Sequence, residues 1–579
     1  MKARIEDGIV YSPYPEVEIF NCSFFEATKK ACLTDPDKPA LIDDSVTLTK
    51  SEFVARLRRY AAGLQRHGVR PGDRICVHVG NSVDNFVAMC SCLVAGASIV
   101  LAKPSLTERE LRYQITDSDS THLLVEPELA GKGLKVASEL KLKGFFTTGF
   151  ADGFISMEPF AELDESLFRE VPVADPQECL FAIIYTSGTT GLPKGVELTH
   201  YGFLANIGMS RWTFPWDDSD VVLLPTPITH GSGILSVTIS VLLGTTCVIV
   251  PPNLSLADVS RAVEQHKVQE IPYLPGSERL YCSPVALQPQ TQDSHRDLQP
   301  CCCPGTSRLS SAEMRRTGQR LAGLRRVCTG GMPLSQEQYK SMHETFGEGL
   351  QVLANVYAMT EATALLCSPS REHATGVDMG FPAPADKVQG GLTCCSSETY
   401  WPHVVDRMTD KRLGPYQTGE LCYKAPTVMK GYYKRPKETA EFFDEEGWCK
   451  SGDAGYYDQD GRIYFVQRFK EMIKCMDNQV VPAELEELLL RKHSADIVEV
   501  CVVGLPNPSY GEAPAAVVVT RCAEVTQDLP ELSTRIKKTV TENCAVHKHL
   551  YGGVFFVDSI PKTESGKTNR PAVLKMCVA

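Results

Sequence analysis

The feature that most restricts the fold of this chain is a repeated alternation of helix-like stretches with short β-rich runs. Residues 51–69 (SEFVARLRRYAAGLQRHGV) precede residues 73–79 (DRICVHV), and residues 257–268 (ADVSRAVEQHKV) precede residues 270–274 (EIPYL). Helices that alternate with strands in this way are typical of parallel sheets covered by helices. The first two thirds of the chain are therefore expected to be α/β.

The pattern changes from about residue 419. Short strands and turns follow, and Asp460-Gly461 lies between two strand-like runs as a hairpin turn would. After Lys470 the segment is α+β-like: Pro482 stands where a first helical turn begins, and a strand EVCVVGL follows. A chain of 579 residues is too long for one core, because single cores stop growing at about 250–300 residues. We predict two domains, residues 1–470 and 471–579.

Composition narrows the function classes. The formal net charge of -12 argues against a nucleic-acid partner, which needs a positive face. The 22 cysteines are scattered and form no zinc-ligand spacing, so neither a disulfide scaffold nor a cysteine-bound zinc site is expected. The chain starts without an apolar leader and ends in MCVA rather than SKL. These signals predict a cytoplasmic protein and disfavour a peroxisomal one.

Two apolar stretches superficially resemble membrane spans. Residues 86–102 and 234–250 are shorter than the roughly 20 residues that a spanning helix needs. Each is interrupted by a glycine, Gly96 or Gly244, before a β-branched finish. We predict a helix, a turn and a buried strand in each, and no transmembrane segment.

The strongest local signal is the run IIYTSGTTGLPKGVELTH, residues 183–200. A β-rich run enters a loop whose glycines allow backbone N–H groups to approach an anion, whose hydroxyls add donors, and whose lysine adds a mobile charge. The Walker pattern does not fit this run. A polar hairpin loop is the alternative, because the same residues dominate turns. The candidate phosphate-binding residues are Thr186, Ser187, Gly188, Thr189, Thr190, Gly191 and Lys194.

The string YTSGTTGLPKGV closely resembles the phosphate loop of the acyl-adenylate-forming (AMP-binding) superfamily. That family includes acyl-CoA synthetases, 4-coumarate–CoA ligases, beetle luciferases and nonribosomal peptide adenylation domains. Other strings resemble further family motifs in the family's order, from about residue 40 to 572: LPTPITHGSG, CTGGMPL, NVYAMTE, TGELCYKAPTVMKGYY, GWCKSGDAGYYDQDGRIYFVQRFKEMIK, VVPAELE and PKTESGKTNR.

The resemblance implies a nucleotide site. Tyr357 would stack on adenine, Thr360 would bind the α-phosphate, and Glu361 would hold a magnesium ion, for which carboxylate oxygen is a suitable ligand. Asp453 would accept hydrogen bonds from both ribose hydroxyls, and Arg468 would also reach the ribose. Without the motifs, these would be a packed aromatic, surface or turn acids and a solvated arginine.

The resemblance also implies an acyl pocket and a catalytic lysine. Gly330 and Gly331 would form the wall between adenine and the acyl tunnel, and His230 would lie near the substrate carboxylate, although a lone histidine is as often structural. Lys567 would bridge the carboxylate and the α-phosphate during adenylation, where its alternative is an ordinary surface lysine.

The fold implied by the resemblance is a large domain of helix-covered sheets plus a distorted β-barrel, with a small mobile α+β C-terminal domain. Lys470 would be the hinge between the domains, and Lys474 would lie on the other face of the small domain. In the family that domain rotates, so that one face serves adenylation and the other thioester formation.

The chain departs from the family at several positions. Ala358 stands where glycine is usual and would crowd the acyl pocket. Gln467 replaces an aspartate, and Asp477 replaces a glycine beside the coenzyme A path, where a negative charge would weaken the binding of phosphates. Residues 282–318 and 388–402 lack periodic structure. Our hypothesis is that they are translated intron or frameshifted sequence; if genuine, they are exposed loops.

These observations predict an ATP-dependent acid–CoA ligase that acts on a fatty or aryl-propenoic acid. Its small-molecule partners would be the carboxylic acid, ATP with Mg²⁺, and coenzyme A as co-substrate. A luciferase-like adenylate oxygenase shares the motifs and is an alternative. A nucleotide- or acyl-binding homologue impaired in turnover is a second alternative, suggested by the departures.

Overall fold

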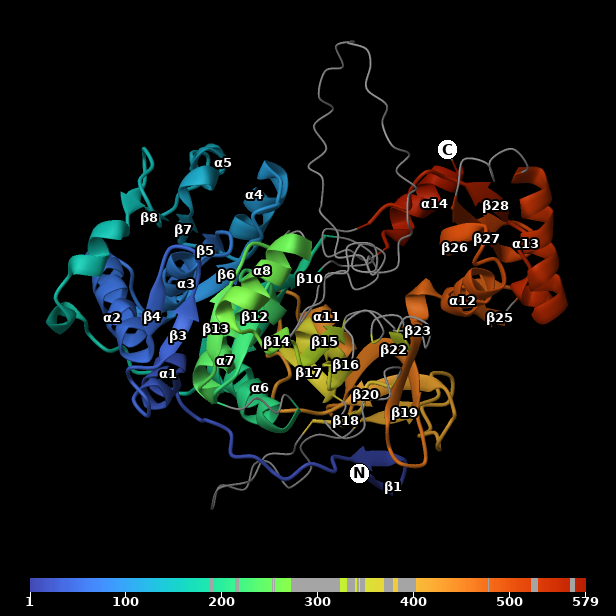
Figure 1. The fold of residues 1–579 in the computed structure, drawn as a ribbon, viewed down its shortest axis with the longest axis horizontal. Helices are drawn as coiled ribbons and strands as arrows, with labels where there is room; N and C mark the ends of the chain where they lie inside the picture. Colours follow the sequence, from blue (N-terminus) through green and yellow to red (C-terminus); the bar gives the residue numbers. More distant parts are fainter. Residues whose placement is uncertain are drawn as a thin grey trace, which may run out of the picture.

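A computed structural model gives the fold of the chain (Figure 1). It describes residues 1–186, 192–213, 218–252, 254, 256–271, 323–330, 339–340, 343, 349–368, 378–383, 402–476, 478–521, 529–562 and 568–578. Residues 282–318 and 388–401 of the two atypical segments, and Asp477, lie outside this part.

An 8-stranded sheet carries the N-terminal part of the fold. Its strands β10, β6, β5, β7, β8 and β9 run parallel, and β11 and β21 extend one edge in the antiparallel sense. In sheet order the strands are β21 (Gly431–Tyr432), β11 (Lys194–Thr199), β10 (Leu180–Thr186), β6 (Ser98–Leu101), β5 (Arg74–His78), β7 (His122–Val125), β8 (Gly144–Thr147) and β9 (Ile155–Ser156).

A 9-stranded sheet lies beside it in the chain's first two thirds and is parallel in its middle. In sheet order its strands are β18 (Phe381–Pro382), β17 (Ala364–Ser368), β16 (Val352–Met359), β15 (Arg326–Gly330), β14 (Glu270–Ile271), β12 (Val221–Leu224), β13 (Thr246–Ile249), β3 (Pro39–Ile42) and β4 (Thr47–Thr49). The predicted α/β class with parallel sheets is confirmed.

The α-helices whose bounds the structure describes in this part are α1 (Phe24–Cys32), α2 (Lys50–Arg66), α3 (Val83–Val94), α4 (Glu108–Asp117), α5 (Ala130–Ala137), α6 (His200–Thr213), α7 (Gly231–Leu243), α8 (Leu256–His266) and α11 (Pro436–Phe442). Helix α2 begins with a capping box, in which Thr49 and Glu52 satisfy each other's backbone N–H groups. The predicted helix-then-strand pairs are thus confirmed as α2 followed by β5 and α8 followed by β14.

Both membrane-like stretches fold as predicted. Helix α3 leads through Gly96, at φ +98°, to β6, and α7 ends at Gly244, at φ +92°, before β13. Glycine adopts this left-handed conformation without a steric penalty, so it ends each helix. Within the described part of the chain, no helix combines the length and the apolarity needed to cross a bilayer.

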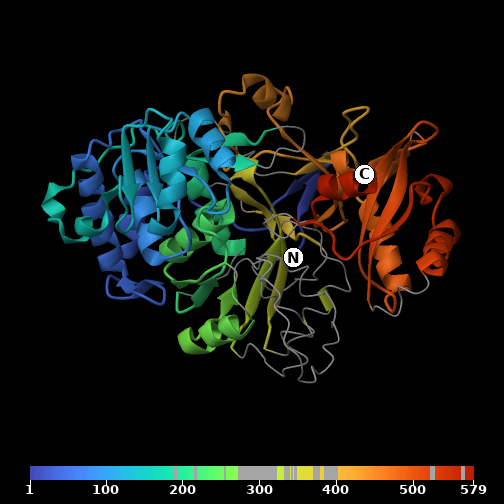
Figure 2. The ribbon, with the colours of Figure 1, turned by 90° about the horizontal axis from the view of Figure 1, so that it is seen from above.

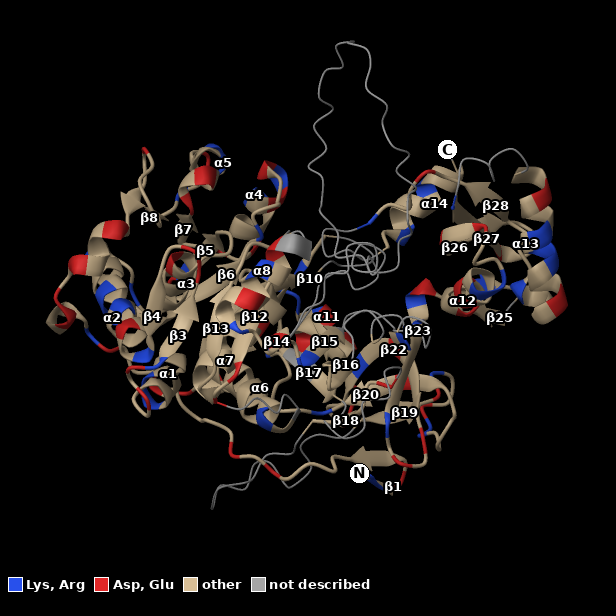
Figure 3. Ribbon diagram, viewed as in Figure 1, with Lys and Arg blue, Asp and Glu red and all other residues tan. Residues whose placement is uncertain are grey.

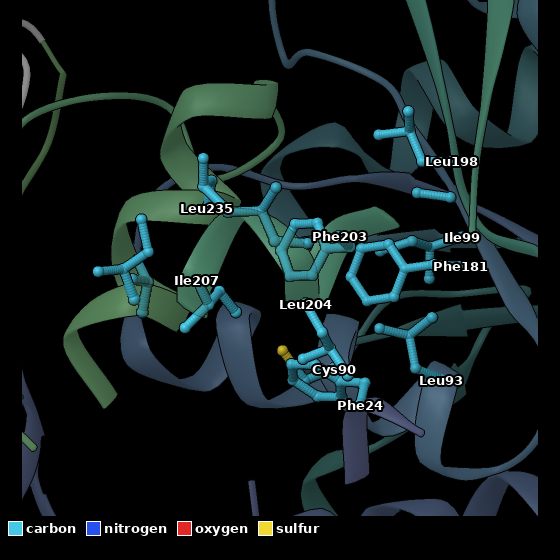
Figure 4. Packing of buried hydrophobic residues seen from close by; sticks show 14 of the residues in the cluster. Phe24, Cys90, Leu93, Ile99, Phe181, Leu198, Phe203, Leu204, Ile207 and Leu235 are labelled. Carbon is cyan, nitrogen blue, oxygen red and sulfur yellow. The ribbon is translucent and has the colours of Figure 1, made fainter. Parts of the chain in front are cut away.

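The main hydrophobic core joins strands of the first sheet to helices α1, α3, α6 and α7 (Figure 4). Phe181 of β10 stacks on Phe203 of α6 with ring centroids 4.0 Å apart, and Phe24 of α1 lies 5.8 Å from Phe181. Aromatic pairs at these separations contribute beyond their buried area. This core fixes the β10 end from which the candidate phosphate loop starts.

A buried ion cluster joins three strands of the second sheet. Arg326 of β15 donates from Nε to Glu270 of β14 at 2.8 Å and pairs through Nη2 with Asp220, which precedes β12. All three side chains are buried. Because taking charges out of water is costly, the cluster depends on its partners remaining together.

The antiparallel strands form a 6-stranded sheet in the order β1 (Arg4–Glu6), β2 (Ile9–Tyr11), β19 (His403–Val405), β20 (Gly419–Tyr423), β22 (Cys449–Tyr457) and β23 (Ile463–Arg468). The predicted hairpin turn at Asp460-Gly461 is confirmed between β22 and β23. The predicted distorted barrel is corrected: among the described strands this sheet does not close, because its first strand β1 and its last strand β23 do not pair with each other.

The C-terminal residues form a 5-stranded sheet of their own from β25 (Asn478–Val480), β24 (Ile473–Cys475), β27 (Gly511–Thr520), β26 (Ile497–Asn507) and β28 (Gly553–Phe556). Helices α12 (Pro482–Lys492), α13 (Leu529–Asn543) and α14 (Arg570–Val578) accompany it. As predicted, Pro482 opens a helix. Figures 1 and 2 both place these elements opposite the N-terminal helices, and Figure 3 shows acidic and basic residues interspersed along the ribbon.

Candidate nucleotide site

The candidate phosphate loop connects the two strands of a hairpin. Strands β10 and β11 are antiparallel, and Thr186 pairs with Lys194 at the end that the loop joins. The Tyr113 hydroxyl of α4 donates to the Pro193 carbonyl at 2.8 Å and anchors the returning strand. Residues 187–191 (Ser187, Gly188, Thr189, Thr190 and Gly191) lie outside the described residues. A hairpin and a phosphate cradle are therefore compatible interpretations of one loop.

Glu361 stands just after the end of β16. It lies in a short 3₁₀ helix, Thr360–Ala362, which ends at Thr363 in the left-handed conformation. Its carbonyl accepts the Met429 N–H at 2.7 Å, and its carboxylate oxygen Oε1 accepts the Tyr432 hydroxyl at 2.8 Å. Both ends of the residue are thus fixed by the segment that leads into β21.

Strands β15 and β16 bring the other predicted residues to the same edge. They are parallel neighbours, and Gly330 pairs with Val356, directly before Tyr357. Because parallel strands end at one edge of a sheet, Gly330 and Thr360 emerge on the same side. Gly331 lies outside the described residues.

Asp453 is the most unusual carboxylate in this region. It pairs directly with Arg468 across β22 and β23, and the Arg468 Nε lies 3.2 Å from its Oδ1. The Tyr357 hydroxyl donates to the other oxygen, Oδ2, at 2.6 Å. Oδ1 is buried without a hydrogen-bond partner among the described residues, since the Arg468 contact lacks hydrogen-bond geometry. A buried acceptor in this state suits a hydroxyl donor from a ligand.

Burial also sets the electrostatics of Asp453. Desolvation raises the pKa of this carboxyl above its ordinary value of 3.8, and the charge of Arg468 acts in the opposite direction. The negative charge of Glu361 raises it further, which places the two carboxylates within electrostatic reach of each other. The pKa of Tyr357 is raised by burial and by Asp453, so its phenol stays a neutral donor.

Tyr357 itself is only 9% exposed, and its hydroxyl is directed to Asp453. Its ring lies among the core residues beside Phe465, with ring centroids 6.4 Å apart. The predicted stacking of adenine on this ring stays a prediction. Ala358, which follows it, is partly exposed and pairs with Leu365 of β17.

His230 has a local structural role. It is the N-cap of α7: its Nδ1 lies 3.3 Å from the Ser232 N–H that it accepts and 2.7 Å from the Ser232 hydroxyl. A Cβ atom at Gly233 would lie 1.9 Å from the Pro227 carbonyl oxygen, so this tight turn requires glycine. A role of His230 beside a substrate carboxylate stays a prediction.

The predicted hinge lysines lie on either side of the junction with the last sheet. Lys470 lies in a 3₁₀ turn, Phe469–Glu471, directly after Arg468, while Lys474 is exposed on β24. Gln467, which replaces the usual aspartate, is buried and donates to the Glu471 carboxylate at 3.0 Å. Lys567 lies outside the described residues.

One residue of this region was not predicted from the sequence. Tyr432 of β21 contacts Glu361 through its hydroxyl, and the ammonium of Lys194 lies 4.8 Å from the centre of its ring. The residue belongs to the string KGYY, but a two-residue strand has no periodicity that would indicate its neighbours. The proximity of Tyr432 to Lys194 becomes visible only in the pairing of β21 with β11.

The comparisons with known proteins agree with these motifs. The family model described as AMP-binding enzyme matches residues 28–433, and the AMP-binding enzyme C-terminal domain matches residues 484–567. The chain is 30% identical over 541 residues to 4-coumarate–CoA ligase 5 of Oryza sativa subsp. japonica, covering 92% of this chain and 90% of that protein. It is 28% identical over 584 residues to 4-coumarate–CoA ligase 3 of the same plant, covering 98% and 94%.

Solved structures share the fold. The crystal structure of ATP-bound MatB from Rhodopseudomonas palustris superposes with a TM-score of 0.78 at 22% identity, covering 96% of this chain and 99% of that one. The predicted resemblance is confirmed, because the family model spans most of the chain. The chain therefore belongs to the AMP-binding enzyme family.

Proposed function

We propose that this protein is an ATP-dependent acid–CoA ligase with residues 1–470 and 471–579 as its two domains. The observation that carries the proposal is that Lys194 and Glu361 both contact Tyr432, while Glu361 lies within electrostatic reach of Asp453. These three charged residues are positioned by three different sheets and match the family's phosphate, metal and ribose residues. The curated relatives with which the chain aligns over most of its length are named 4-coumarate–CoA ligases.

The first half-reaction joins two anions. A carboxylate oxygen of the acid attacks the α-phosphorus of ATP, the bond to the β-phosphate oxygen breaks, and pyrophosphate leaves. The residues must hold both anions in line and spread the developing charge. In the proposal Lys194, the loop residues 186–191, Thr360 and Lys567 supply these positive or donor groups.

The second half-reaction transfers the acyl group. The coenzyme A thiolate attacks the acyl carbon, the bond to the phosphate oxygen breaks, and AMP leaves. In the proposal the C-terminal domain turns about Lys470 between the two steps, and exposed Lys474 comes to the site for the second. Asp477 would then lie near the phosphates of coenzyme A and weaken their binding.

The residues present fit Mg²⁺ and ATP. Glu361 offers a fixed carboxylate, which is a hard oxygen ligand, and bound Mg²⁺ would neutralise phosphate charge. The buried Oδ1 of Asp453 offers the acceptor that a ribose hydroxyl needs. These fits support a nucleotide site and say nothing of the acid, which we propose to be a fatty or aryl-propenoic acid.

The proposal is tested by acid-dependent AMP release from ATP, with and without coenzyme A, over a panel of aliphatic and aromatic acids. We expect AMP formation to rise with coenzyme A for one class of acid. Pyrophosphate exchange without thioester formation would contradict the ligase function and indicate an enzyme that only adenylates. Light emission or an oxidised product would also contradict it and would favour the luciferase-like alternative. No turnover with any acid would favour the binding homologue.

The affinity for AMP is expected to fall on acidification, beginning above the pH of about 4 at which an ordinary aspartate titrates. The raised pKa of Asp453 means that the carboxylate protonates early, and a protonated oxygen no longer accepts both ribose hydroxyls. Calorimetric titration with AMP from about pH 8 down to about pH 4 measures this. Asp453→Asn should lower the affinity about 10-fold or more and remove most of the dependence.

The stability of the ligand-free protein should change in the opposite sense. A folded-state pKa above the unfolded value means that the native state binds the proton more tightly, so Asp453 favours folding at low pH and this contribution is lost as pH rises through the raised pKa. The matched control for Asp453→Asn is Asp460→Asn, which changes a half-exposed turn residue and should leave both pH dependences as in the wild type. A wild-type affinity for AMP that is still flat at about pH 4, where an ordinary aspartate titrates, would contradict the prediction.

A further inference from the structure

Tyr432 lies between two charged residues that the proposed function requires. Its strand β21 extends the first sheet through β11, with Val196 opposite Tyr432, so that Lys194 is the diagonal neighbour on the same face. Its hydroxyl reaches Glu361, which follows β16 of the second sheet. A single side chain thus connects the two sheets at the candidate site.

Contacts with α11 and with Lys194 hold the Tyr432 ring in place. Phe442 of α11 packs against it edge to face with centroids 6.0 Å apart, and Tyr432 N–H donates to the Thr439 hydroxyl at 2.9 Å. The ammonium of Lys194 lies 4.8 Å from the ring centre, within the range of a cation–π contact. The ring therefore restricts where Lys194 can stand.

The Tyr432 hydroxyl is the donor in its hydrogen bond with Glu361. An ionised carboxylate can only accept hydrogen bonds, so the phenol O–H donates to Glu361, at 2.8 Å. Its donation occupies Oε1 of Glu361. A carboxylate that binds a metal is commonly oriented by such an outer hydrogen bond, which fixes the free oxygen and its direction.

Resting on the proposed function, we propose that Tyr432 is a positioning residue for the metal–nucleotide complex. Its hydroxyl orients Glu361 so that Oε2 is presented to Mg²⁺, and its ring sets Lys194 at a fixed separation from that carboxylate. Neither contact involves the substrate acid. The inference predicts that hydroxyl and ring can be separated by mutation.

Tyr432→Phe tests the hydroxyl. We expect the dissociation constant of Mn²⁺ from the complex with α,β-methylene-ATP, measured by electron paramagnetic resonance, to rise about 10-fold. Affinity for AMP without metal should stay unchanged, which a general structural defect would not allow. The matched control is Tyr433→Phe, the same change one residue away. It removes a hydroxyl that donates to Asp119, which follows α4. This variant should bind Mn²⁺ as the wild type does.

Tyr432→Leu tests the ring. It should weaken Mn²⁺ binding as Tyr432→Phe does and weaken the triphosphate further, because Lys194 loses the ring face. Unchanged Mn²⁺ affinity in Tyr432→Phe, or an equal loss of metal-free AMP affinity, would overturn the inference. If the wild type releases no AMP with any acid and the Mn²⁺ shift persists, the proposed ligase reaction fails while the role of Tyr432 stands.

Discussion

Replacing Glu361 by glutamine is expected to lower acid-dependent pyrophosphate exchange on the order of 100-fold or more. Glutamine keeps the shape of the side chain and still accepts the Tyr432 hydroxyl, which lies 2.8 Å from Oε1 in the wild type. What it loses is the negative charge, and a neutral amide oxygen is a weak ligand for Mg²⁺. The loss should therefore fall on metal-dependent steps alone.

The measurement is isotope exchange between pyrophosphate and ATP at several Mg²⁺ concentrations. Half-saturation by Mg²⁺ should rise, while AMP binding without metal should stay within twofold of the wild type. The control is Glu178→Gln, which removes an exposed acid that pairs with Lys430 near the same segment. An exchange rate in Glu361→Gln equal to that of the control would contradict the assignment of Glu361 to the metal.

Replacing Arg326 by methionine is expected to destabilise the protein by about 3–5 kcal/mol. The change keeps an apolar stem of similar length but removes the positive charge that pairs with Asp220 and Glu270, both of which are buried. Against a total stability of about 5–15 kcal/mol, such a loss is severe. The effect should appear as a lower urea concentration at the midpoint of unfolding.

The neighbouring arginine supplies the matched control. Arg325 is exposed, so Arg325→Met should leave the midpoint nearly unchanged. Adding Asp220→Asn and Glu270→Gln to Arg326→Met should recover part of the loss, because the buried charges are then removed together. A triple variant less stable than Arg326→Met would show that packing, rather than unpaired charge, causes the destabilisation.

Local signals predicted local structure well. Gly96 and Gly244 marked the helix ends that turn apolar runs into α3–β6 and α7–β13, and Asp460-Gly461 marked a hairpin. Each of these depends on a residue whose backbone preference acts within a few positions. The existence of elements and their order therefore followed from the sequence.

Contacts between distant segments did not follow from it. Nothing in the pattern of residues relates Arg326 to Glu270, and nothing in KGYY relates Tyr432 to Glu361. The first pair arises from the order of strands within one sheet and the second from the contact between two sheets, and a single sequence encodes neither in a periodic signal. The open six-stranded sheet is a similar case, because closure depends on whether the two edge strands meet.

The two-sided pairing of β11 has a consequence for changes in chain length. Its register is set by β10, through Thr186 opposite Lys194, and also by β21, through Val196 opposite Tyr432. A strand fixed on both edges cannot slip by one residue without turning Lys194 to the opposite face. An in-frame deletion between residues 187 and 193 should thus lower activity more than any single replacement there. A loop transplanted from a relative should function only when its length is conserved.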